Sequence, residues 1–265
     1  MTAFAYQQDP QDVCFDFPGI NAKLWASYKL LTEQSPYYHS LLGGEFSEAT
    51  VQTGSSATMQ EDEPQDYQAI RIYEDSDDET DEHFQGQLAV LTQPKSSTIL
   101  PHKKVIVADT ACTTYLATLV WMGSRYVRFA PLRSSVDGSS GGTSESRLQQ
   151  IITDTQANSR LPISASPKSI YRLAHLLELT DLQEAALDNL VSQLTPQNAA
   201  TELFSDVASA YPALRDCILD FVVGKWAGLR ASDAWTKIKE LANAHELPAG
   251  AAYTALLLFE RANGA

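Results

Sequence analysis

The sequence predicts an α/β (α+β) fold, in which a small sheet flanked by helices is followed by an all-α C-terminal extension. Two observations lead to this prediction. Short runs of aromatic and β-branched residues, a composition typical of strands, occur at residues 12–17 and 104–107. From residue 166 onward, apolar residues recur with helical spacing, and the starts of the helices are marked by capping residues, prolines and acids.

The first elements follow from local patterns. Residues 12–17 nearly alternate and end at a Pro-Gly turn, which predicts a strand whose partner is the segment 23–28. Between residues 30 and 42 the apolar spacing predicts two short helices. Ser35 is placed to cap the second helix, with Pro36 at its first position, and a Gly-Gly pair ends it.

Negative charge is concentrated in one segment. Residues 61–85 contain eleven acids and one arginine, a net charge of −10 out of −14 for the chain. Residues at about 50–100 are also poor in apolar side chains, so we interpret them as an acidic, largely disordered insertion with a candidate strand at 68–73. The acids are interpreted as a solvated spacer. The alternative is a docking or regulatory tail in which Ser76 and Thr80 are kinase substrates.

Ordered structure is expected again after the insertion. A strand at 104–107 leads to a helix that begins at Thr110 and ends at Gly123, and residues 126–129 are expected to form a second short strand. The apolar face of the helix is formed by Tyr115, Leu116, Leu119, Val120 and Met122. Helical spacing of this kind favours a core position for Trp121 over an exposed interface.

A flexible connector, rich in Ser and Gly, is predicted at about 134–160. The remaining chain predicts six helices with short joints. Their starts are marked at residues 166, 180, 195, 212, 232 and 248. Trp226 and Trp235 are interpreted as core anchors of this helical part, although a groove for a partner helix is the alternative.

The composition disfavours several classes of function. A net charge of −14 and a pI near 4.7 argue against direct binding of nucleic acid or of an anionic membrane. The cysteines Cys14, Cys112 and Cys217 lie in separate apolar runs and are expected to be buried free thiols in a reducing compartment. Because no signal segment or membrane-spanning run stands out, we expect an intracellular protein that is cytoplasmic, nuclear or both.

No motif of the sequence indicates catalysis. The five histidines are scattered, and none lies three or four residues from another histidine or a cysteine, so no metal site is expected. A phosphate-binding loop and a dinucleotide-binding fingerprint are absent from the sequence, and its Gly-x-Ser-x-Gly run at 138–142 lies in a Ser- and Gly-rich stretch, not between a predicted strand and helix as a nucleophile elbow requires. We therefore expect no cofactor and no enzymatic activity, and we keep an enzyme of unknown chemistry as the remote alternative.

Three segments, in this order, resemble the core of BTB/POZ domains. They are LWASYKLLTEQSPYYHSLLGGEFSE at 24–48, KKVIVADTACTTYLATLVWMGSRYVRF at 103–129 and SPKSIYRLAHLLELTDLQEAALDNLVSQL at 166–194. In the first segment, Leu31, Ser35, Tyr38 and Glu48 match the family pattern. Residues 195–241 resemble the BACK-like helical extension often found behind such a domain. The acidic insert and the segment YVRFAPLRSS are similar to the fungal branch of the family.

The resemblance implies a BTB/POZ domain over residues 1–194, which includes the insertion and the connector, and a BACK-like extension over 195–265. Two departures from the family pattern stand out. Ser27 occupies a position where many members have histidine, and only eleven residues precede Asp12, so the N-terminal device for swapped dimers is expected to be absent. No kelch, MATH or zinc-finger region follows, so no separate substrate-binding domain is expected.

The function that the resemblance implies is that of an adaptor or scaffold that binds other proteins. Cullin-binding members often carry an apolar-x-Glu triplet just after the second helix, and Phe46 and Glu48 hold these positions here. A cullin scaffold of a ubiquitin ligase is therefore the leading candidate partner. The alternatives are a scaffold that forms a homodimer or a transcription-associated co-regulator, neither with a ligase role. The alternative interpretation of this triplet is that Phe46 packs into its own domain and Glu48 is solvated.

Overall fold

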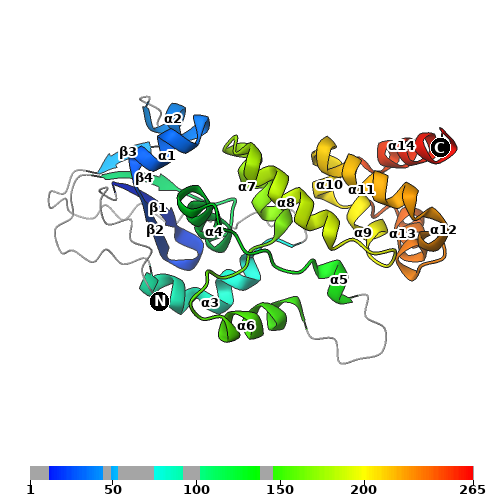
Figure 1. Cartoon of the computed structure of the whole chain (residues 1–265), viewed down its shortest axis with the longest axis horizontal. Coiled ribbons are helices and arrows are strands. Elements are labelled where there is room, and N and C mark those ends of the chain that lie inside the picture. Colours follow the sequence, from blue (N-terminus) through cyan, green and yellow to red (C-terminus); the bar gives the residue numbers. More distant parts are fainter. Residues whose placement is uncertain (1–11, 44–48, 53–74, 92–101, 138–145, 265) are drawn as a thin grey trace.

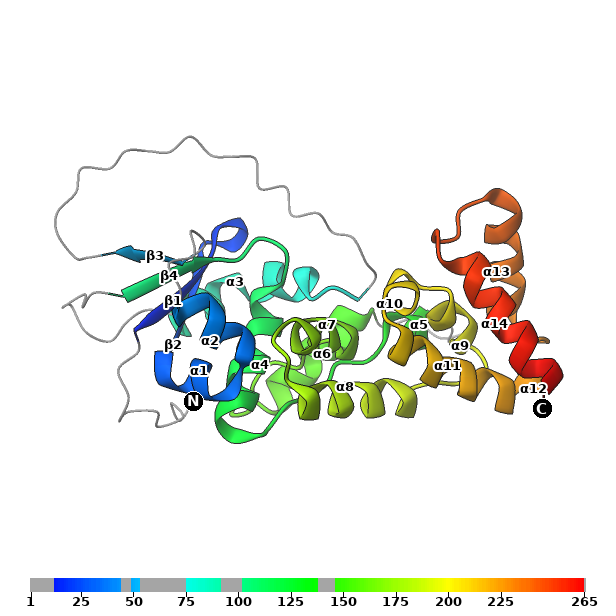
Figure 2. The same ribbon diagram turned by 90° about the horizontal axis from the view of Figure 1, so that it is seen from above.

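The structure is a computed structural model that describes residues 12–43, 49–52, 75–91, 102–137 and 146–264. It is a mixed α/β fold that is mostly helical, with one small sheet. Figure 1 shows an elongated molecule with the sheet, α1 and α2 at one end, α7 and α8 in the middle and α9 to α14 at the other end. Figure 2, seen from above, shows the same order of elements. The predicted α/β class, with a helical extension behind the sheet, is therefore confirmed.

Within the described residues, four strands form the sheet in the order β2-β1-β4-β3. Their bounds are β1 Val13–Phe17, β2 Ala22–Ala26, β3 Ala49–Gln52 and β4 His102–Ile106. β1 and β2 form an antiparallel hairpin, β4 lies parallel to β1, and β3 is antiparallel to β4. Val13, Phe15 and Phe17 are all buried, and because side chains alternate along a strand they give the sheet its core-facing side.

The helices surround this sheet and continue beyond it. In the N-terminal part they are α1 Tyr28–Gln34, α2 Pro36–Gly43, α3 Asp78–Leu91, α4 Cys112–Ser124, α5 Arg133–Asp137 and α6 Arg147–Ala157. The helical part comprises α7 Pro167–Leu176, α8 Thr180–Ser192, α9 Ala199–Leu203, α10 Asp206–Ala210, α11 Pro212–Gly224, α12 Trp226–Leu229, α13 Asp233–Ala244 and α14 Ala251–Gly264. No helix of the described residues has the length and apolarity needed to cross a membrane.

Several predicted helix starts are confirmed at the level of single hydrogen bonds. The side chain of Ser35 accepts a hydrogen bond from the amide of Tyr38 at 3.2 Å, as expected for the residue before α2. Ser166 and Ser232 cap α7 and α13 in the same way. These caps, with Pro at the first position of α2 and α7, explain why local sequence identified these starts correctly.

The prediction of a largely disordered insertion is wrong for residues 75–91. This segment contains α3, and the side chains of Phe84 and Leu88 are 3% and 0% exposed. Thr80, Phe84 and Leu88 recur every four residues and form a narrow buried stripe, which the dense charge on the other faces conceals in the sequence. The candidate strand at 68–73 lies outside the described residues.

The predicted connector at 134–160 is also partly wrong, since α5 and α6 lie within it and Ile151 is fully buried. Residues 126–129 do not form a strand, because only Phe129 pairs, in a single bridge to Ala165. One predicted helix from residue 195 is replaced by the short helices α9 and α10, and an extra short helix, α12, precedes α13.

The apolar face predicted for α4 is correct only in part. Tyr115 and Met122 of this face are buried, whereas Leu116, Leu119 and Val120 are half-buried. Trp121, for which a core position was expected, is buried. The buried side also includes small polar residues such as Thr114 and Thr118, whose hydroxyl groups are hydrogen-bonded. A hydroxyl with a partner costs little to bury, so apolar spacing alone could not identify this face.

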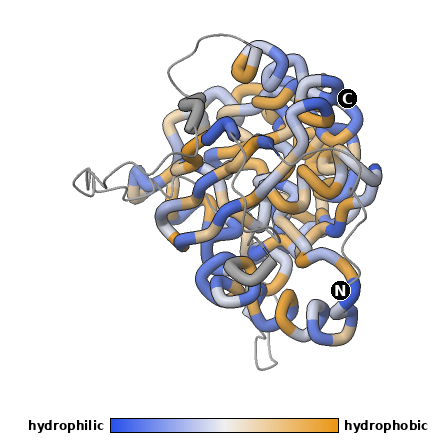
Figure 3. Tube along the Cα trace, turned by 90° about the vertical axis from the view of Figure 1, so that its left-hand side faces the viewer, coloured by the Kyte–Doolittle hydropathy of each residue, from blue (hydrophilic) through white to orange (hydrophobic). Residues whose placement is uncertain are grey.

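One continuous hydrophobic core runs through the molecule from β1 to α14. In Figure 3, hydrophobic and hydrophilic residues are interspersed along strands and helices, the pattern of elements that bury one side. Trp226 and Trp235 pack against this core and against each other, with ring centroids 5.1 Å apart, as expected for anchors. All three cysteines are free. Cys14 and Cys112 are buried, and burial raises the pKa of the Cys14 thiol to about 11, whereas Cys217 is only half-buried.

Candidate functional site

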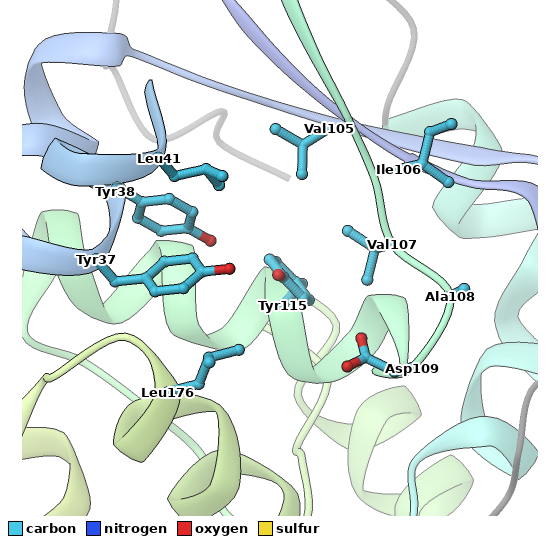
Figure 4. Close-up of a pocket in the computed structure, with 10 residues that line it drawn as sticks. All are labelled: Tyr37, Tyr38, Leu41, Val105, Ile106, Val107, Ala108, Asp109, Tyr115 and Leu176. Carbon is cyan, nitrogen blue, oxygen red and sulfur yellow. The ribbon is translucent and has the colours of Figure 1, made fainter. Parts of the chain in front are cut away.

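An open pocket of about 290 Å³ lies where α2, β4, α4 and α7 meet. Its lining comes from Tyr37, Tyr38 and Leu41 of α2, from residues 105–109 of β4 and the loop after it, and from Tyr115 and Leu176. Figure 4 shows the phenol groups of Tyr37 and Tyr38 directed toward Tyr115 across the pocket. We call it the tyrosine pocket, after Tyr37, Tyr38 and Tyr115.

The walls of the tyrosine pocket are held together by contacts between distant segments. The hydroxyl of Ser35 donates to the carbonyl of Leu177 at 2.8 Å, which ties the start of α2 to the end of α7. Below the pocket, the Phe15 ring lies 5.6 Å from the Tyr38 ring and 5.3 Å from the Tyr115 ring, centroid to centroid. Aromatic contacts at these distances are attractive, so the two tyrosines are fixed by the core beneath them.

Burial favours the neutral forms of Tyr38 and Tyr115. Burial, and then the neighbouring Tyr115 side chain, raise the pKa of Tyr38 well above its ordinary value. Burial likewise raises the pKa of Tyr115. Tyr38 is 1% exposed, and its hydroxyl makes no hydrogen bond of normal geometry with the described residues. A buried hydroxyl without a partner costs free energy.

The rim of the tyrosine pocket is apolar and exposed. Ile106 and Leu176 are 53% and 45% exposed, although large aliphatic side chains are usually buried. The carboxylate of Asp109 is exposed at the mouth and points toward the pocket in Figure 4. Exposed aliphatic side chains therefore lie beside a few polar groups at the mouth of the pocket.

The predicted cullin contacts, Phe46 and Glu48, lie outside the described residues. α2 ends at Gly43, so the triplet starts three residues after a helix that lines the tyrosine pocket. Sequence reasoning did not identify the pocket itself. The available signals were the Tyr37-Tyr38 pair at the start of α2 and the apolar run of residues 105–107, in which the alternation of an extended chain buries Val105 and Val107 and exposes Ile106.

A second feature of the fold is a buried group of charged side chains. We define the ionic cluster as Asp75, Asp77, Arg147, Lys168 and Glu202, each of which is at most 3% exposed. Lys168 Nζ lies 2.6 Å from Asp75 Oδ2 and 3.0 Å from Glu202 Oε2. Arg147 Nη2 lies 2.9 Å from Asp77 Oδ1. The cluster joins the start of α3 to α6, α7 and α9, so it links the sheet region to the helical part.

Further hydrogen bonds hold Asp77 of the ionic cluster in place. Asp77 accepts from the hydroxyl of Thr114 at 2.7 Å and from the amide of Ser166 at 2.9 Å. Burial would raise the pKa of Asp75, but Lys168 and Arg147 lower it below its ordinary value. For Asp77, burial outweighs Arg147 and the pKa is raised. Burial disfavours the charged forms of Lys168 and Arg147, yet their acidic partners raise both pKa values, so both stay charged.

These contacts correct the interpretation of the acids as a solvated spacer. Asp75, Asp77 and Asp81 are buried and paired within the fold. Thr80 is fully buried, and Ser76 is half-buried, so the folded chain does not present Thr80 to a kinase. Since the ionic cluster is closed to solvent, its charged groups are not accessible to a substrate in the folded chain. No group of three or more metal-binding side chains was found among the described residues.

Asp81 holds the start of α4. Its carboxylate accepts hydrogen bonds from the amides of Cys112 at 2.6 Å and Thr113 at 2.8 Å, the orphan donors of the first turn. Burial raises the pKa of Asp81 from 3.8 to about 6, against the opposing effect of these hydrogen bonds. Because the folded pKa exceeds the unfolded pKa, protonation of Asp81 stabilises the fold below about pH 4, and this contribution is lost as the pH rises to about 6.

We expect Asp81→Asn to remove this pH dependence. The stability of the unsubstituted chain, measured relative to the variant, should fall by about 3 kcal/mol between pH 4 and pH 7, since one pKa unit corresponds to about 1.4 kcal/mol. Urea unfolding at pH 4, 5, 6 and 7 measures the difference. A difference that does not change with pH would contradict the raised pKa.

Comparison with known proteins found no family model that matches the chain and no curated protein that matches its sequence.

Proposed function

We propose that the chain is a protein-interaction adaptor of the BTB/POZ type, and that its tyrosine pocket belongs to the surface that binds a cullin scaffold. The order of elements supports the proposal. The β1-β2 hairpin, the α1-α2 helix pair, β4 with α4, and the α7-α8 pair follow one another as the resemblance implies. Helices α9 to α14 then stand where the BACK-like extension is expected.

One observation carries the proposal furthest. The tyrosine pocket is assembled from all three segments that resemble the family: Tyr37 lies in 24–48, Ile106 in 103–129 and Leu176 in 166–194. These segments meet at an open pocket whose rim exposes Ile106 and Leu176. Exposed apolar residues around a concave site favour an interface with another protein. In the sequence, the candidate residues Phe46 and Glu48 come three and five residues after the last residue of α2, Gly43.

Calorimetric titration of the full chain with the N-terminal domain of a cullin tests the proposal. We expect a dissociation constant below about 1 µM. Leu176→Asp should weaken binding by about 30-fold, the effect of losing about 2 kcal/mol at an interface anchor. The Phe46→Ala, Glu48→Ala double variant should weaken it as well. Leu256→Asp is the matched control, since Leu256 is 62% exposed on α14, at the opposite end of the molecule (Figure 1).

The same samples separate the alternatives. A folded chain that gives no heat with the cullin domain would contradict the adaptor proposal. The second candidate, a scaffold that forms homodimers, is favoured by Tyr253, Leu256 and Phe259, which are exposed at spacings of three residues on α14. In that case the chain should sediment as a dimer, and Leu256→Asp should convert it to a monomer.

A further inference from the structure

We propose that the tyrosine pocket accepts an arginine side chain of the partner protein. The inference deepens the proposed function and rests on it, because it names the chemistry by which that surface recognises its partner. It rests on the size of the pocket, its apolar walls, the Tyr38 hydroxyl at its base and the Asp109 carboxylate at its mouth.

The size and walls of the pocket fit one long side chain. Its volume of about 290 Å³ is just below the range of sites that enclose whole small molecules, about 300–1,000 Å³. Leu41, Val105 and Val107 line it with aliphatic groups. Arginine buries its methylene stem along apolar surface of this kind while its charged head reaches polar groups.

The base of the pocket offers oxygens to a donor. The Tyr38 hydroxyl is buried and has no partner of normal geometry among the described residues, and it points into the pocket beside the hydroxyl of Tyr37 (Figure 4). Each phenol oxygen can accept a hydrogen bond, and a guanidinium group carries five N–H donors and no acceptor. The phenol rings also attract a cation placed over their faces. A purely apolar side chain would make no hydrogen bond to these oxygens.

The charge at the mouth selects a cation. Asp109 is exposed and directed toward the pocket, so an incoming carboxylate would be repelled and a guanidinium attracted. The net charge of −14 favours a basic partner segment at longer range. Between the two basic side chains, arginine fits better, because its planar fork can reach several oxygens at once and stack on an aromatic ring.

Methyl-detected NMR of the full chain tests the inference with N-acetyl-L-arginine amide as the probe. We expect the methyl signals of Leu41, Val105 and Val107 to shift with a dissociation constant of about 1–10 mM, as for a single side chain. N-acetyl-L-citrulline amide, which has the same shape without the charge, should bind at least about fivefold more weakly.

Two variants give the inference a sharper test. Asp109→Asn should weaken arginine binding about fivefold, whereas Glu240→Gln, at an exposed acid of α13, should leave it unchanged. Tyr38→Phe should also weaken binding about fivefold, yet leave the unfolding midpoint nearly unchanged, because the buried hydroxyl that it removes makes no hydrogen bond of normal geometry in the free chain. These results would support the arginine site.

Equal shifts with arginine and citrulline amides, or undiminished binding by Asp109→Asn, would overturn the arginine inference. The outcome is distinct from that of the cullin titration. If the chain binds arginine amide but gives no heat with the cullin domain, the cullin proposal is contradicted and the arginine inference is still supported. If the chain binds the cullin domain but its pocket does not distinguish the two amides, only the arginine inference is contradicted.

Discussion

Replacing Lys168 with methionine is expected to lower the free energy of unfolding by about 3–5 kcal/mol. Lys168 is 1% exposed, and its ammonium group lies 2.6 Å from Asp75 and 3.0 Å from Glu202. Methionine keeps most of the volume of the side chain but leaves two buried carboxylates without this cation. Removing one partner of a buried ion pair costs far more than the pair contributes, because the desolvation of the other charge is no longer compensated.

Urea unfolding monitored by circular dichroism measures this effect. Lys239→Met is the matched control, since Lys239 is exposed on α13 and the substitution should change stability by less than about 0.5 kcal/mol. Adding Glu202→Gln to Lys168→Met should recover part of the loss, because one of the uncompensated charges is then removed. If Lys168→Met matched the control variant, the side chain would not be enclosed by the two acids.

The position of Lys168 bears on how the chain divides into domains. The sequence favours a boundary at residue 194, between the BTB/POZ-like part and the helical extension. Lys168 on α7 pairs with Asp75 before α3 and with Glu202 on α9, and the hydrophobic core is continuous across the boundary. A charge shared across the boundary and a common core both favour one cooperative unfolding transition. Probes at Trp121 and at Trp235 should therefore report the same midpoint.

Local signals account for what the sequence predicted correctly. The strand at 12–17 alternates and meets a Pro-Gly turn, and α2, α7 and α13 begin behind serine caps, so the residues that determine these elements are neighbours in the chain. Tyr38 lines the tyrosine pocket, and Ser35 ties the helix that carries it to the end of α7.

The wrong predictions concern residues whose contact partners lie far away in the sequence. The acids before α3 resembled a solvated run because their counter-ions are far away: Arg147 is separated from Asp77 by 70 residues. One signal in the sequence pointed to the pairing. Arg147 and Lys168 both lie in the first turn of a helix, where the helix dipole disfavours a cation. A cation placed there in spite of the dipole indicates an acidic partner from elsewhere in the chain.

Arg147→Met is expected to have the other large effect, a loss of about 3–5 kcal/mol in the free energy of unfolding. Arg147 is 3% exposed and is the most connected side chain of the ionic cluster. Its guanidinium reaches Asp77 at 2.9 Å and Glu79 at 2.8 Å, and Nε donates to the carbonyl of Pro131 at 3.0 Å. Methionine would leave Asp77 buried and ionisable with no cation beside it, in a site where burial already raises its pKa.

Hydrogen exchange distinguishes this loss from a general weakening of the fold. Arg147 fixes the segment that leads into α3, so amides of α3 should lose protection by a larger factor than amides of α11, which lies in the helical part. Arg147→Lys should recover less than half of the lost stability. A lysine ammonium group is a compact charge and cannot replace the several donors of the planar guanidinium group. Arg160→Met, at an exposed arginine, is the control. Uniform loss of protection across α3 and α11 would mean that Arg147 stabilises the whole molecule as one unit and does not anchor the acidic segment in particular.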